Sequence, residues 1–234
     1  MKGKKLVIIL MGPPGAGKGT QAILLSEKFQ LYYFETSKIL EEVFQQQKKG
    51  KTIKIKNEIY SIEKEKKLWL EGKLCSPPFV TFLVKRKIKK LFLEGQNLLL
   101  AGSPRTLFEA KEIMPFLEKL YGKQNIKILL LQISEKETLE RNSKRRICEL
   151  FRHPIVYLKE NAKLKYCPLD GSKLLKRKGL DDPKTIRIRI QEYKERTLPI
   201  IDYFKKRKYR VLEIDGSPPP AQVFKSILKA LNLQ

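Results

Sequence analysis

The start of the chain constrains the fold more than any other segment. Leu6–Met11 is a continuous apolar run, typical of a β-strand buried on both faces of a sheet. It is followed directly by Gly12-Pro-Pro-Gly-Ala-Gly-Lys-Gly-Thr20, and then by apolar residues at helical spacing up to about Phe29. A strand, a glycine-rich bend and a helix in this order predict an α/β domain whose first helix begins at the bend.

The rest of the chain repeats this alternation. Segments with the composition of short strands are followed, for the most part, by turns and by stretches with helical periodicity, and a last helix is expected from Pro218-Pro219 to about Leu231. The four later strand segments are Tyr32–Phe34, Leu98–Ala101, Ile126–Ile133 and Tyr209–Ile214. Together with Leu6–Met11, they predict a doubly wound, parallel, five-stranded sheet.

Two stretches interrupt the alternation. Residues from about 35 to 78 contain two helical patterns and no predicted strand. Residues from about 144 to 181 are predicted to be irregular and are rich in lysine and arginine. Insertions that follow strand ends lie above the carboxyl edge of a parallel sheet, where such folds bind their ligands, so both stretches are expected near a binding site.

The glycine-rich bend has the chemistry of a phosphate site. Backbone N–H groups at a helix start, with glycines that permit close approach, form a nest for an anion. Lys18 is placed to reach the β- and γ-phosphates of a nucleoside triphosphate. The general pattern has Ser or Thr directly after this lysine, whereas here Gly19 precedes Thr20. A plain Gly/Pro-rich turn is the alternative, which the order of strand, bend and helix disfavours.

The motifs resemble those of the adenylate kinase family in order and spacing over nearly the whole chain. Gly12–Thr20, continued by Gln21-Ala22, resembles that family's P-loop, and Gly102-Ser-Pro-Arg-Thr106 resembles its Gly-Phe-Pro-Arg-Thr motif. Gly72-Lys-Leu74 resembles the end of its monophosphate-binding insertion. Residues 141–146 and 181–189 resemble the two sides of its lid.

The resemblance implies a P-loop NTP hydrolase-like core at residues 1–34, 79–143 and 182–234, a helical monophosphate-binding insertion at 35–78 and a lid at 144–181. It implies that the γ-phosphoryl group of ATP passes to AMP to give two ADP, with Mg²⁺ accompanying ATP. This chemistry suits the residues present. Phosphoryl transfer depends on positioning and charge neutralisation, and an anionic phosphate acceptor needs no histidine base.

The resemblance also assigns residues to each site. Those it implies for ATP are Gly12, Pro14, Gly15, Ala16, Gly17, Lys18, Gly19, Thr20, Arg141 and Arg145. Those it implies for AMP are Thr36, Gly102, Arg105, Glu109, Lys178 and Arg189. The resemblance makes Lys18, Arg105, Arg145 and Arg189 the catalytic residues. Three of them are arginines, which suits phosphate because a guanidinium group can make bidentate contacts with it.

Four positions depart from the family pattern. Glu41 stands where the family has an arginine for the AMP phosphate, and Glu109 where a glutamine reads adenine. Lys38 and Ala101 replace two aspartates that help to order magnesium-bound water. These departures leave two alternatives: a kinase for another nucleoside monophosphate, or a nucleotide-binding homologue with weak or no turnover.

The lid region carries an incomplete metal motif. Some adenylate kinases hold zinc there with Cys-x2-Cys followed by Cys-x2-Cys or Cys-x2-Asp. Here Cys148 keeps the first ligand and Cys167 and Asp170 keep the second pair, with His153 as a candidate fourth ligand. The alternative is a small apolar core of the two cysteines and Phe151. Cys75 is expected to be a packing residue.

The charge balance points to anionic partners. Lys and Arg total 50 against 25 Asp and Glu, a formal net charge of +25, which suits nucleotides and also permits non-specific nucleic acid binding. Three cysteines form no all-paired disulfide framework, which suits a reducing compartment. The apolar run Leu6–Met11 is too short for a signal peptide or a membrane span. We therefore expect a cytoplasmic protein, monomeric and without membrane attachment.

Overall fold

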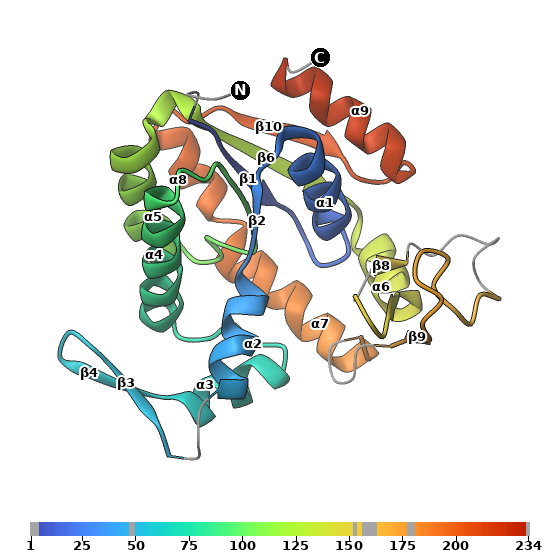
Figure 1. Cartoon of the computed structure of the whole chain (residues 1–234), viewed down its shortest axis with the longest axis horizontal. Coiled ribbons are helices and arrows are strands. Elements are labelled where there is room, and N and C mark those ends of the chain that lie inside the picture. Colours follow the sequence, from blue (N-terminus) through green and yellow to red (C-terminus); the bar gives the residue numbers. More distant parts are fainter. Residues whose placement is uncertain (1–4, 47–49, 152–153, 156–162, 177–180, 233–234) are drawn as a thin grey trace.

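The fold centres on a parallel sheet with strand order β10-β6-β1-β5-β2 (Figure 1). The computed structural model describes residues 5–46, 50–151, 154–155, 163–176 and 181–232. In the central pairings, Ile9 of β1 lies opposite Leu100 of β5 and Ile128 of β6. The predicted α/β class and its five strands are confirmed; the strands are β1 (Val7–Met11), β2 (Tyr32–Glu35), β5 (Leu98–Ala101), β6 (Ile126–Gln132) and β10 (Val211–Asp215).

Helices cover both faces of the sheet (Figure 1). Val7 and Ile9 belong to a core cluster with α4 (Pro77–Leu93), α5 (Leu107–Tyr121) and α8 (Ile200–Lys206). Ile8 and Leu10 belong to a second cluster with α1 (Lys18–Phe29) and α9 (Pro220–Leu231). Both faces of β1 are therefore buried, which explains its unbroken apolar sequence. No helix in the described part of the chain is long and apolar enough to cross a membrane.

The stretch from 35 to 78 contains a β-hairpin, so the prediction that it has no strand is wrong. After α2 (Thr36–Gln46), antiparallel strands β3 (Thr52–Ile55) and β4 (Glu58–Ser61) meet through a two-residue turn, and α3 (Ile62–Leu70) follows. The turn places Lys56 at a φ of 53°. Ile53, Ile55 and Tyr60 pack against the large core cluster. β3 alternates polar and apolar residues over only four positions, and β4 has Ile59 and Tyr60 side by side, so neither strand shows a clear period of two in the sequence.

The stretch from 144 to 181 is also more regular than predicted. Short strands β7 (Arg146–Cys148), β8 (Pro154–Ile155) and β9 (Leu174–Leu175) form a three-stranded antiparallel sheet. Strands of two or three residues are too short to show a periodicity. Helices α6 (Glu135–Lys144) and α7 (Pro183–Glu192) flank it, capped by Ser134 and Asp182. A 3₁₀ turn at Lys123–Asn125 and a π-turn at Tyr193–Thr197 complete the elements described.

The central sheet should carry much of the stability. Leu100 in β5 is fully buried between the helical layers. We expect Leu100→Ala to lower the free energy of unfolding by about 2–5 kcal/mol, because it removes apolar contacts and leaves a cavity. Leu93→Ala is the matched control, since Leu93 is 75% exposed at the end of α4. Chemical denaturation measures the free energy of unfolding of each variant. An equal loss in both variants would contradict the buried position of Leu100.

Candidate active site

Two adjoining hollows lie at the carboxyl edge of the sheet. The larger one, of about 530 Å³, is bounded by the glycine-rich bend, the end of β5, helices α6 and α7, and residues 216–220 after β10. The smaller one, of about 40 Å³, lies between α2, α3, α4 and the start of α5. Gly102 and Arg105 line both. The two insertions thus contribute walls to one composite site, as expected for a sheet of this topology.

Close packing fixes the bend. Gly12 has a φ of 140°, and a Cβ atom there would lie 2.3 Å from the carbonyl oxygen of Leu131 at the end of β6. Gly15 has a φ of 84°, and its Cβ would lie 2.5 Å from Nδ2 of Asn142 on α6. Only glycine combines these backbone angles with such a close approach. The bend therefore packs against both the end of β6 and α6. Lys18 follows the bend as the first residue of α1.

The predicted ATP residues come together. The larger hollow is lined by Gly12, Pro14, Gly15, Ala16, Gly17, Lys18, Gly19, Thr20, Arg141 and Arg145. Lys18 bends back onto its own loop, where its Nζ donates to the carbonyl oxygens of Gly12, at 2.6 Å, and Pro13, at 2.7 Å. Arg105 and Arg189 line the same hollow. Arg187, two residues before Arg189, is exposed outside it.

The concentration of positive charge is the main electrostatic feature of the larger hollow. Burial lowers the pKa of Lys18 well below its usual value, and the charges of Arg105, Arg189 and Arg145 lower it further. Burial also lowers the pKa of Arg105. An anion bound among these groups would offset both effects, because it restores the favourable environment that the cations lose on leaving water. The hollow is therefore suited to a polyanion such as a nucleotide polyphosphate.

Two arginines of the lid entrance are held by specific partners. Arg141 donates from Nη1 to the carbonyl oxygen of Gly216, at 2.8 Å, and from Nη2 to that of Ser217, at 2.7 Å. It therefore ties α6 to the loop after β10. Arg145 hydrogen-bonds Asn142 and forms an ion pair with the buried carboxylate of Asp181, at 3.3 Å. These contacts fix the direction of both side chains along the wall of the larger hollow.

The predicted AMP residues divide between the two hollows. Thr36, Gly102, Arg105 and Glu109 line the smaller hollow, and Arg189 lines the larger one. Lys178 lies outside the described residues, as does His153. Cys75 also lines the smaller hollow, and burial raises the pKa of its thiol to about 12, in keeping with the expected packing role.

The four departures from the family pattern lie in different surroundings. Glu41 and Ala101 line the larger hollow, and Glu109 lines the smaller one. Lys38 is exposed and forms an ion pair with Glu35 at 3.5 Å. It lies outside the lining of both hollows. Three of the four replacements therefore lie at the walls of the hollows, whereas Lys38 does not.

Sequence reasoning missed part of the site. The segment 216–220 forms one wall of the larger hollow, although the prolines there were interpreted only as a helix start. Its position after the last strand was the available signal, because ligands bind at strand carboxyl ends. Trp69 contacts Phe44 and also lines both hollows. Other lining residues that had no assigned role are Gln21, Glu35, Lys73, Glu192 and Tyr193.

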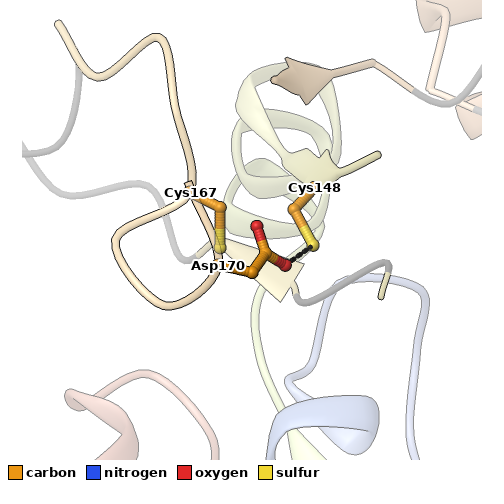
Figure 2. A group of neighbouring side chains, drawn as sticks. All are labelled: Cys148, Cys167 and Asp170. Carbon is orange, nitrogen blue, oxygen red and sulfur yellow. Dashed lines mark hydrogen bonds between the residues drawn. The ribbon is translucent and has the colours of Figure 1, made fainter. Parts of the chain in front are cut away.

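Three of the four predicted metal ligands cluster in the lid (Figure 2). The ligand atoms of Cys148, Cys167 and Asp170 all lie within 4.8 Å of one another, and Cys148 Sγ donates to Asp170 Oδ2 at 3.0 Å. The cysteines are buried and pack with Ile155 and Leu174. Phe151 is 71% exposed, so the alternative that placed it in this core is wrong for that residue.

Comparisons with known proteins agree with this geometry. The family model for adenylate kinase matches residues 10–209. An adenylate kinase of Caldicellulosiruptor bescii is 33% identical over 97% of this chain and 99% of that protein. One of Chlamydia trachomatis is 33% identical over 97% of this chain and 90% of its own length, and one of Phytoplasma australiense is 30% identical over 98% and 99%. The chain therefore belongs to the adenylate kinase family, whose members are phosphotransferases.

Proposed function

We propose that this protein is a working adenylate kinase that reversibly transfers the γ-phosphoryl group of ATP to AMP, giving two ADP. The observation that carries the proposal is the convergence of Lys18, Arg105, Arg145 and Arg189 on one hollow beside the glycine-rich bend. Family membership supplies the reaction class, and the hollow supplies a place where a triphosphate and a monophosphate can meet.

ATP is proposed to bind with its phosphates in the bend. The backbone N–H groups of Gly15 and of residues 17–20, at the start of α1, offer donors and the positive end of a helix dipole. Lys18 would exchange its two loop carbonyls for the β- and γ-phosphate oxygens. Arg141 and Arg145 would add charge from the lid side, so that the triphosphate is neutralised along its length.

AMP is proposed to bind where the smaller hollow opens into the larger one, because the smaller hollow alone, at about 40 Å³, is too small for a nucleotide. Thr36 and Gly102 would contact AMP, Glu109 lies at the same wall, and Lys178 belongs to this proposal from the sequence alone. Arg105 is central because it lines both hollows, so its guanidinium can contact the acceptor phosphate and the group in transfer. Arg189 would share that charge from the opposite wall.

The transfer step then depends on alignment and charge. The attacking oxygen already belongs to an anionic phosphate, so no protein base has to remove a proton from it. Lys18, Arg105, Arg145 and Arg189 would stabilise the charge spread over the transferring group. The insertion 35–78 and the lid 144–181 would close over the core at 1–34, 79–143 and 182–234. Closure excludes water, which would otherwise compete as acceptor.

Mg²⁺ is expected to enter with ATP. The wall of the larger hollow contains the Thr20 hydroxyl and the Glu35 carboxylate, and oxygen atoms are the ligands that magnesium prefers. Thr20 would hold the ion beside the phosphates and Glu35 would order its water. Bound there, the ion neutralises phosphate charge. The apolar Ala101 leaves this support thinner than in the family pattern, so the phosphates and water must supply most of the coordination.

Zinc is proposed as a structural ion of the lid. Two buried cysteine sulfurs and one carboxylate lie close enough to share a single ion, and their chemistry is that of structural zinc sites. His153 completes a set of four in the sequence, although it lies outside the described residues. The ion would cross-link the end of β7 with the turn at residues 167–172.

The proposed setting is a cytoplasmic monomer whose partners are ATP and AMP. The net charge of +25 would also give salt-sensitive, non-specific binding to nucleic acid. A second candidate function is a kinase for another monophosphate. Glu109 at the acceptor hollow and Glu41 beside it are the observations that favour this candidate.

The first test is an acceptor panel. Purified protein with ATP, Mg²⁺ and each nucleoside monophosphate in turn should form ADP fastest with AMP. Lys18→Ala should slow transfer by about 100-fold or more, because it removes a charge placed at the phosphates. Lys28→Ala is the control, since Lys28 is exposed at the other end of α1. ATP binding without any product would support the homologue without turnover.

Glu41 gives a charge test of the acceptor site. Glu41→Arg should lower KM for AMP about tenfold, because a charge-assisted phosphate contact contributes roughly 1.5–3 kcal/mol. Glu42→Arg makes the same charge change at an exposed neighbouring position and should leave KM unchanged. Steady-state kinetics at fixed ionic strength separates the local contact from general attraction. An unaltered KM in Glu41→Arg would refute the alignment at this position.

Metal analysis tests the lid. Protein purified without chelators should contain one zinc ion per chain when its metal content is measured by elemental mass spectrometry. Cys148→Ser and Cys167→Ser should lose it, because a harder, neutral hydroxyl replaces a thiolate ligand. Cys75→Ser should keep the metal, since Cys75 lies at the smaller hollow and outside the cluster. Absence of stoichiometric zinc in the unaltered protein would end the proposal.

A further inference from the structure

The backbone of Arg105 is held on both sides by buried side chains. Its N–H donates to Oε2 of Glu109, at 3.0 Å, and its carbonyl oxygen accepts from Oγ1 of Thr197, at 2.8 Å. Glu109 is 2% exposed and Thr197 is 7% exposed. The two residues come from different elements, the first turn of α5 and the π-turn after α7. Both peptide groups that flank this arginine are thus fixed from outside its own loop.

The Glu109 carboxylate is engaged with the protein itself. Besides the Arg105 N–H, it accepts from the Thr106 hydroxyl at 3.2 Å and from the Ser103 hydroxyl. Thr106 in turn caps α5 by accepting from the Glu109 N–H at 3.2 Å. This arrangement joins the helix start to the loop that carries Arg105. It uses three of the roughly four lone-pair positions that a carboxylate offers to donors, so little capacity remains for a nucleotide base.

The π-turn explains how Thr197 reaches the loop. The N–H of Leu198 bonds the carbonyl oxygen of Tyr193 at 2.8 Å, one residue beyond the α-helical spacing. A single π-turn of this kind adds a residue to the helical path and redirects the side chains that follow it. Thr197 is turned inward by this step, whereas its neighbours Arg196 and Leu198 are partly or largely exposed.

We propose that Glu109 and Thr197 are positioning residues that clamp the backbone of Arg105 and so aim its guanidinium at the phosphates. The inference rests on the proposed function, in which Arg105 contacts the acceptor and the transferring group. It assigns Glu109 a role that acts through Arg105 and not through the base of the acceptor. Preorganisation of this kind matters because a buried cation stabilises a transition state only when its direction is set in advance.

Thr197 allows the sharper experiment. Thr197→Val keeps the shape of the side chain but removes the donor to Arg105, and kcat should fall about tenfold with little change in KM for ATP. Thr197→Ser restores the hydroxyl and should restore kcat. Thr81→Val is the matched control, because the buried Thr81 hydroxyl makes no hydrogen bond within the described residues. Equal kcat in Thr197→Val and the unaltered protein would overturn the role of Thr197.

Glu109 separates positioning from base recognition. Glu109→Leu removes the acceptor for the Arg105 N–H and for two hydroxyl groups, so kcat should fall about tenfold while the ratio of activity on AMP to that on GMP stays constant. A tenfold change in that ratio with unchanged kcat would show that Glu109 reads the base and would overturn its positioning role. Thermal unfolding of each variant distinguishes lost activity from lost folding.

Arg105→Ala distinguishes failure of the clamp from failure of the function. If Arg105→Ala retains full activity, the proposed role of Arg105 is wrong, and positioning of its guanidinium cannot contribute to catalysis. If Arg105→Ala loses activity while Thr197→Val and Glu109→Leu keep theirs, the function stands and the clamp is wrong. The clamp is supported when all three variants lose kcat and when adding Thr197→Val to Arg105→Ala costs no further activity.

Discussion

Mutual repulsion among the cations of the larger hollow is the constraint on which the site depends. Lys18, Arg105, Arg145 and Arg189 line this hollow, and burial together with the charges of the three arginines lowers the pKa of Lys18. The protein contains this repulsion with fixed partners. Lys18 donates to loop carbonyls, and Arg145 pairs with the buried Asp181. The remaining excess of positive charge favours an anionic ligand in this hollow.

The local contacts around the bend explain why this charge can be held in one place. The close approach of Gly12 to β6 and of Gly15 to α6 makes the bend part of the sheet's rigid end. Arg141 adds a second connection by binding the carbonyls of Gly216 and Ser217. The bend, α6 and the loop after β10 therefore form one wall, although they are distant in the sequence. Because this wall is rigid, a ligand displaced from its best position would lose interaction energy with it.

The sequence predicted those parts of the molecule that have a strong local signal. The five strands were recognisable because each is apolar and bounded by turn residues, and the bend because its glycines and Lys18 follow a strand. The hairpin at 52–61 was missed because β3 alternates over only four residues and β4 does not alternate. β7, β8 and β9 were missed because two or three residues carry no period. Thr197 had no signal at all, since its role depends on a π-turn and on a contact 92 residues away.

One continuous segment links the separate parts of the site. Arg189 on α7 lines the larger hollow, and Glu192 at the end of the same helix accepts from the N–H of Leu74 at 3.2 Å. A few residues later, Thr197 holds the carbonyl of Arg105. The segment from 189 to 197 therefore contacts the larger hollow, the end of the insertion at 35–78 and the arginine that lines both hollows. Because these contacts share one helical path, a rotation of that path would alter all three. The shapes of the two hollows are consequently set together.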